Sequence, residues 1–393
     1  MGFASGAVSF RRFAVTGKGP KAVSEAMLEQ LAEHALRPSD LGVPEEIEYG
    51  WNGGQHVLDG GFSFEHSVFA DALHFALRID TNKVPGELKK AYLLMEEQAA
   101  AASNPSGLIS KNQKRDARES VRQKIDEETR SGKFRRSKIL AVLWDVPNRM
   151  LYSPASGGAF EKLAELFERT FGLSLLPLTS GSLAQRWLEP RSRRRDYEDL
   201  RPTRFVNGPN GESDQPEYPW ISKGPEPKDF LGNEFLVWLW HEADARTSIV
   251  ATESAGDVTV FIDKSLDLAC AYGQSGYDAL RGDGPSRLPE ARAALRSGKV
   301  PRRAGLVLES SGQQFALSLA AETMSVTGAK LPEVEADTPR VLFEERVALL
   351  RELGKTSDAL FETFLKLRAS STWEGHASVI RRWILSTKKV AAA

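Results

Sequence analysis

Two consecutive helices predicted in residues 85–131 limit the possible folds more than any other feature. The first begins at Pro85, a residue suited to the first turn of a helix, and ends at the turn signal of residues 103–107. Its apolar stripe consists of Leu88, Ala91, Tyr92, Met95 and Ala99. The second helix, from about residue 110 to 130, is so charged that only a narrow seam of Ala117, Val121 and Ile125 is apolar. We expect the two helices to pair as a helical hairpin.

The second helix of this hairpin gathers its cations on one side. The basic residues recur at offsets of 0, 3, 4, 7 and 11, which is the spacing of one helix face, and they are Lys111, Lys114, Arg115, Arg118 and Arg122. Three more follow where the chain is expected to return to a sheet, and they are Lys133, Arg135 and Arg136. A row of cations without a dedicated base reader is what a phosphate backbone requires. The alternative is a solvated helix crossed by ion pairs, which is the commoner fate of such sequences.

The charge of the whole chain conceals local basic segments. The net charge is −1, but residues 111–138 carry +6, residues 281–303 carry +5 and residues 186–204 carry +3. This asymmetry predicts a polarised surface. In the second segment we take as further candidate DNA contacts Arg292, Arg296, Lys299, Arg302 and Arg303. Surface solubility is the competing interpretation there, and the 191–195 arginine run falls in a presumed linker.

The remaining pattern predicts an α+β chain of several lobes. Strands are expected in residues 8–15, two or three within 46–80, 138–144, 150–152, 173–178, two or more within 246–271 with a turn near Asp263, 304–308 and 314–319. Helices are expected in residues 22–36, 159–171, after 181, 230–241, 288–296 and 339–367. The expected divisions are 1–84 and 136–189 for a central α+β lobe, 85–135 for the basic hairpin, 190–228 for a linker or insertion, 229–335 for a second α+β lobe and 336–393 for a C-terminal helical segment.

No set of residues in the sequence forms a recognisable catalytic or metal motif. The six histidines lack metal-ligand spacing, and for His66 and His74, which fall in one strand region, packing or surface positions are the commoner interpretation. The lone cysteine, Cys270, falls in a predicted strand and fits a reducing compartment. No stretch is apolar for the roughly 18 residues that a membrane helix needs. We therefore expect a non-catalytic cytoplasmic protein without cofactor or metal.

Several segments, in order, resemble the RdgC family of recombination-associated proteins. They are residues 9–13, 51–54, 83–92, 111–133, 139–144, 167–178, 288–299 and 306–319. Together with their surroundings they cover about two thirds of the chain. Residues 190–285 match that family poorly, and the tail after about residue 330 is longer than in typical members.

This resemblance implies a horseshoe-like protomer of antiparallel sheets, with a projecting helical hairpin near the dimer contact and a long C-terminal helix. It implies a ring-shaped homodimer around duplex DNA that restrains the recombinase RecA by occupying the DNA, and a nucleoid-associated location. No active site is implied. Two other functions stay open on the residues alone. One is a protein-interaction module that uses the long terminal helix and the tryptophan-rich residues 230–240, and the other is a metal-dependent nuclease.

Overall fold

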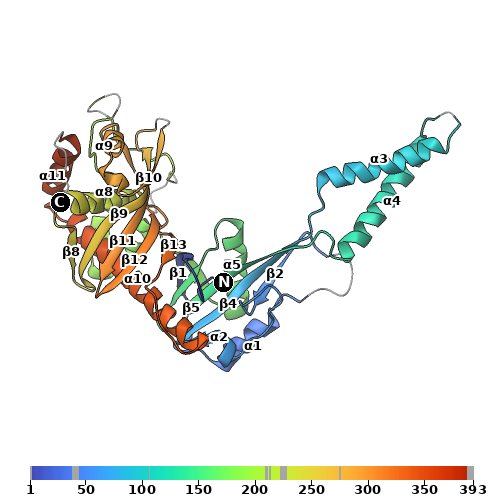
Figure 1. Cartoon of the computed structure of the whole chain (residues 1–393), viewed down its shortest axis with the longest axis horizontal. Coiled ribbons are helices and arrows are strands. Elements are labelled where there is room, and N and C mark those ends of the chain that lie inside the picture. Colours follow the sequence, from blue (N-terminus) through green and yellow to red (C-terminus); the bar gives the residue numbers. More distant parts are fainter. Residues whose placement is uncertain are drawn as a thin grey trace.

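A computed structural model describes residues 2–37, 44–105, 107–208, 211, 214–221, 228–273 and 276–386. Within these ranges the chain is α+β, as the sequence predicts, with antiparallel strands joined in one extended sheet (Figure 1). The α-helices are α1 (Glu25–Glu33), α2 (Phe64–Ser67), α3 (Gly86–Ala102), α4 (Lys111–Arg130), α5 (Gly158–Phe171), α6 (Ser180–Leu188), α7 (Arg194–Asp199), α8 (Phe230–Ala245), α9 (Pro289–Arg296), α10 (Pro339–Arg368) and α11 (Trp373–Leu385). None of these helices is both long and apolar enough to cross a bilayer.

The described strands follow one path from end to end of the sheet, in the order β10-β9-β11-β12-β13-β1-β6-β5-β4-β2. Three short strands lie off this path: β3 on β4, β7 on β1 and β8 on β9. The bounds are β1 (Val8–Thr16), β2 (Ile47–Asn52), β3 (Val68–Phe69), β4 (Ala72–Thr81), β5 (Arg136–Asp145), β6 (Met150–Ser153), β7 (Ser174–Pro177), β8 (Ile249–Thr252), β9 (Gly256–Cys270), β10 (Tyr277–Gly282), β11 (Lys299–Ser310), β12 (Gln313–Ala320) and β13 (Val326–Lys330).

Strand β1 joins the two halves of the sheet. Its first residues pair with β13, where Val8 lies opposite Ala329, and its later residues pair with β6, where Arg12 lies opposite Tyr152. One strand thus belongs to the hydrogen-bonded ladders of both halves. The N-terminal half has its own apolar core, in which Phe75, Trp144 and Phe167 are completely or almost completely buried. A second, larger core fills the C-terminal half and continues onto the other face of the N-terminal half.

Helix α10 runs along the molecule and contacts both halves of the sheet. Near its beginning, the ring of Phe343 packs 4.3 Å from that of Phe69 in the N-terminal half. In its middle, Asp358 receives two hydrogen bonds from the guanidinium of Arg12 on β1, at 2.7 and 2.8 Å. Near its end, Phe361 packs edge-on against Phe235 of α8, with ring centroids 5.2 Å apart. The predicted long C-terminal helix therefore packs against both halves of the sheet and connects them.

Three features differ from the prediction. Residues 190–228, expected as a linker or insertion, contain α7 and bury Tyr197 and Tyr218 in the larger core, so their described parts belong to the packed body. The turn expected near Asp263 is a bulge inside β9, where Lys264 adopts a φ of 62° and the register against β11 shifts. Strands β10 and β13 and helix α11 were not predicted. Cys270 is buried at the end of β9, in the strand expected for it.

Candidate nucleic-acid interface

The predicted helical hairpin is α3 and α4, and it projects from the end of β4 and the beginning of β5 in the N-terminal half of the sheet (Figure 1). Ser110 begins α4 through a capping box, in which its hydroxyl accepts a hydrogen bond from the backbone N–H of Gln113 and the Gln113 side chain accepts one from the Ser110 N–H. The helix stops before Gly132, whose φ of 79° favours glycine. Local chemistry therefore sets both ends of the basic helix.

A thin apolar seam and two groups of hydrogen bonds, one at the base and one at the tip, hold the two helices of the hairpin together. Ala117 and Val121 are buried in the seam between the helices. At the base, the Glu128 carboxylate accepts hydrogen bonds from Tyr92 Oη at 2.9 Å and from Lys133 Nζ at 2.6 Å. These bonds lower the pKa of Glu128, Lys133 contributing most. At the tip, the amides of Asn104 and Gln113 bond to each other. The seam is too narrow to cover the basic face of α4.

The five cations predicted on one face of α4 are all exposed to solvent. Within the described residues, Lys111, Lys114, Arg118 and Arg122 form no ion pair, and Arg115 only approaches its neighbour Asp116 at 3.5 Å. Among the described residues, Arg115–Asp116 is the one ion pair formed by these five cations, so the face is solvated rather than crossed by ion pairs, and a plain solvated face stays the alternative to a binding surface. A face of unpaired cations repels itself, and an anionic partner relieves that repulsion.

The three candidates at the base of the hairpin occupy different settings. Lys133 is half-exposed but is paired with Glu128. Arg135 is mostly buried beside Asp80, with 4.0 Å between its Nε and the carboxylate. Arg136 is exposed at the first position of β5. Of these three, only Arg136 is exposed without an ion pair among the described residues.

Most candidates of the second basic segment have structural partners. The guanidinium of Arg292 donates to Trp383 O at 3.0 Å and covers the indole ring, and Arg296 donates to Ile384 O and Ser386 O. These two side chains cap the C-terminal end of α11. Lys299 is paired with Asp278 at 2.7 Å, and Arg302 is paired with Glu322 at 3.0 Å. Of the five, only Arg303 is exposed without an ion pair among the described residues, so this segment is not a continuous cationic surface.

The segments proposed as surfaces for partner proteins are largely buried. The tryptophan-rich segment becomes α8, and its residues from Phe230 to His241 are buried, so it is core and no partner surface. The side of α10 that carries Phe361 and Phe364 is buried as well. Within the described ranges, no group of three or more His, Cys, Asp or Glu side chains is arranged to hold a metal ion.

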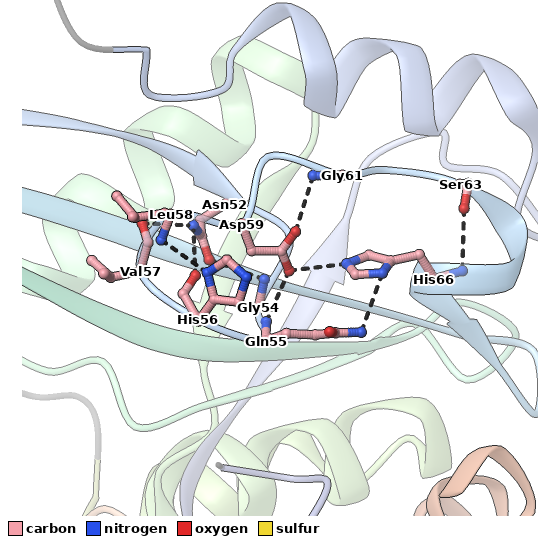
Figure 2. A network of polar contacts seen from close by, with 10 residues as sticks. All are labelled: Asn52, Gly54, Gln55, His56, Val57, Leu58, Asp59, Gly61, Ser63 and His66. Carbon is pink, nitrogen blue, oxygen red and sulfur yellow. Dashed lines mark hydrogen bonds and ion pairs between the residues drawn. The ribbon is translucent and has the colours of Figure 1, made fainter.

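A polar cluster that the sequence analysis missed surrounds Asp59, in the loop after β2 (Figure 2). Its carboxylate accepts hydrogen bonds from the N–H groups of Gln55 and Gly61 and from His66 Nε2 at 2.9 Å. These bonds outweigh partial burial and hold the pKa of Asp59 below its ordinary value. Gln55 donates in turn to His66 Nδ1, so both nitrogens of this imidazole are engaged. The only hint in the sequence was that His66 and His74 fall in one region.

His74 on β4 lies beside this cluster and is 4% exposed. Gly54 packs against it, and a Cβ added there would come within 2.7 Å of the imidazole Cε1. Burial, together with the nearby His66, lowers the pKa of His74 to about 4. Its Nε2 has no hydrogen-bond partner within the described residues. The ring is therefore neutral at pH 7 and carries an unused polar atom.

The depressed pKa of His74 should make the protein less stable in mild acid. Below pH 6.5 the unfolded chain takes up a proton at this residue, whereas the folded chain does so only near pH 4, so stability falls with pH across this window. Between pH 7 and pH 5 this residue alone should lower the free energy of unfolding by about 2 kcal/mol. Urea titrations at both pH values, on the wild type and on His74→Phe, would measure the difference. Equal losses in both proteins would contradict the assignment.

No family model matches this chain, and no curated protein matches it in sequence. The functional conclusion therefore depends on the geometry of the hairpin and on the resemblance described above.

Proposed function

We propose that this protein binds duplex DNA without strong sequence preference and that the exposed face of α4 is the main contact. The observation that carries the proposal is the row of solvent-exposed cations, of which Lys111, Lys114, Arg118 and Arg122 have no ion pair among the described residues. Such cations displace counterions from phosphates, which provides affinity without reading base edges. The binding requires no chemical step, cofactor or metal.

We further propose that two horseshoe-like protomers close into a ring around the duplex, as the resemblance to the RdgC family implies. The hairpin has a surface suited to such a contact. On α3, Leu94 and Met95 are 56% and 61% exposed, and Met95 belongs to the apolar stripe that was expected to be packed. Neighbouring exposed apolar side chains on a projecting element favour burial against a second copy of the same element. Occupation of the DNA by such a ring would restrain RecA.

A titration over a series of salt concentrations tests the proposal. A fluorescently labelled duplex of about 30 base pairs should bind with a log–log salt slope near −4.5, if about five phosphates are neutralised. Sedimentation of the free protein should give the mass of a dimer. A slope near zero, or no binding at low salt, would contradict DNA binding. A monomer at high protein concentration would contradict the ring-shaped dimer but not DNA binding.

A further inference from the structure

The turn that joins α3 to α4 lies at the free end of the projecting hairpin (Figure 1). Leu108 in this turn is 75% exposed, whereas the neighbouring Ile109 is partly buried. A single exposed leucine is common on protein surfaces. What it can do therefore depends on how firmly the turn holds it and on which groups lie beside it.

Hydrogen bonds fix the backbone of this turn. The side-chain amide of Asn104 donates to the carbonyl of Leu108 and exchanges hydrogen bonds with the amide of Gln113 on α4. Gly107 donates its N–H to the Asn104 carbonyl at 3.0 Å and has a φ of 66°, a conformation that favours glycine. The backbone of the leucine is thus held in place while its side chain extends into solvent. A turn that is ordered beforehand avoids the entropic cost of ordering on binding.

The exposed leucine is close to the first cations of the basic face of α4. Three residues along the chain separate it from Lys111, so the two backbones lie within about 11 Å of each other. Lys111 and Lys114 are exposed, and the first turn of α4 contains no acidic residue. When these cations bind phosphates, as proposed above, the side chain of Leu108 comes beside the base steps between those phosphates.

We propose that Leu108 is a wedge that enters the base stack next to the phosphates bound by Lys111 and Lys114, so that the protein prefers duplex DNA whose stacking is already interrupted, as at a bulge. This inference rests on the proposed DNA binding and adds a substrate preference to it. Leucine is among the side chains that DNA-kinking proteins insert between base steps. Burial of a leucine side chain favours a complex by about tenfold or more, but the opening of an intact base step opposes this gain. A bulge removes that cost whatever the bases are.

The test uses the full-length protein and two labelled duplexes of about 30 base pairs, which differ only by a central bulge of unpaired adenines. Wild-type protein should bind the bulged duplex about tenfold more tightly, which is the gain expected from burial of the leucine. On the matched duplex it should make thymines reactive to permanganate, which oxidises unstacked thymines. Leu108→Ser should lose the preference and the reactivity but keep the affinity for the matched duplex and its salt slope, because the cations of α4 are unchanged. Leu108→Met should retain all four properties.

Leu58→Ser is the matched control and should behave like the wild type, because Leu58 is 77% exposed in the loop after β2, outside the hairpin. Two outcomes would overturn the wedge and leave the proposed function intact. They are wild-type binding with a steep salt slope but without preference or permanganate reactivity, and equal preference in the wild type and Leu108→Ser. Loss of the dimer in Leu108→Ser, measured by sedimentation, would assign the leucine to a protein contact and also overturn the wedge. No binding of the wild type to either duplex at low salt would overturn the proposed function, and the wedge with it.

Discussion

Replacing Lys114, Arg118 and Arg122 together by glutamate should reduce the affinity for duplex DNA by about two to three orders of magnitude near 0.1 M salt. Each cation that neutralises a phosphate contributes about 0.9 to the salt slope, so the slope should become shallower by about three. The measurement is the anisotropy titration over a salt series, with the variant and the wild type side by side. The expected loss is large because all three side chains lie on one free basic face.

This variant should fold as well as the wild type. The three side chains are exposed and form no ion pair within the described residues, so no native contact is lost. Lys114 lies in the first turn of α4, where the helix dipole favours a carboxylate over an ammonium group. Exposed substitutions of this kind change the free energy of unfolding by about 0.5 kcal/mol or less. A loss of binding would therefore report on the contact itself.

A second triple variant separates a local contact from net charge. Lys18→Glu/Lys21→Glu/Arg169→Glu makes the same change of charge at exposed positions outside the hairpin. It should retain a slope close to that of the wild type. If both variants lose binding alike, the total charge and not the α4 face governs affinity. If the hairpin variant binds like the wild type, the contact lies elsewhere, and Arg136 and Arg303 are the next exposed cations to replace.

The hairpin could be predicted because its signals are local. The spacing of the cations, the Ser110 cap and the Gly132 stop all lie within a few residues of the structure that they determine. The partners of the second basic segment could not be predicted in the same way. Arg292 and Arg296 bond to carbonyls 91 and 88 residues further along the chain, and such contacts leave no periodicity in the sequence.

The contrast between local signals and long-range contacts also explains where the structure differs from the prediction elsewhere. Tyr197 and Tyr218 are buried by tertiary packing in a segment of little regular structure, so no apolar period marks residues 190–228 as core. His74 is buried because Phe343, on a helix far along the sequence, packs against Phe69 of β3 and against His74 itself on β4. His66 and His74 were visible in the sequence, but their shared environment was not.

Arg368→Met should destabilise the protein by about 3–5 kcal/mol, which is the largest effect expected of any single substitution discussed. The guanidinium of Arg368 donates from Nε to the Glu234 carboxylate at 2.6 Å, and Glu234 is completely buried in α8. The same carboxylate accepts the N–H and the hydroxyl of Thr203. Methionine fills much of the volume but leaves the carboxylate without its counter-charge. Urea unfolding followed by the fluorescence of the buried tryptophans would measure the loss.

The double variant Glu234→Gln/Arg368→Met identifies the cause of that loss. The amide oxygen of the substituted glutamine can still accept a hydrogen bond from Thr203, but no unpaired charge is left buried. About 2 kcal/mol or more of the lost free energy of unfolding should therefore be recovered. If the double variant is as unstable as the single one, the loss comes from packing instead, since Arg368 also lies over the Trp373 ring, 5.0 Å from its centroid.

The Arg368 network also provides a test of where DNA binds. Trp373 Nε1 donates to Thr203 Oγ1 at 3.0 Å, so the network ties α8, α10 and α11 together at the C-terminal half of the sheet. Among the described residues, the hydrogen bonds, ion pair and ring contact of Arg368, Glu234, Thr203 and Trp373 involve no residue of α3 or α4. At a temperature where Arg368→Met is still folded, its affinity for duplex DNA and its salt slope should equal those of the wild type. Arg368→Met should lose stability but keep DNA binding, whereas the α4 variant should keep stability but lose DNA binding. Together these results would assign stability and DNA binding to separate parts of the chain.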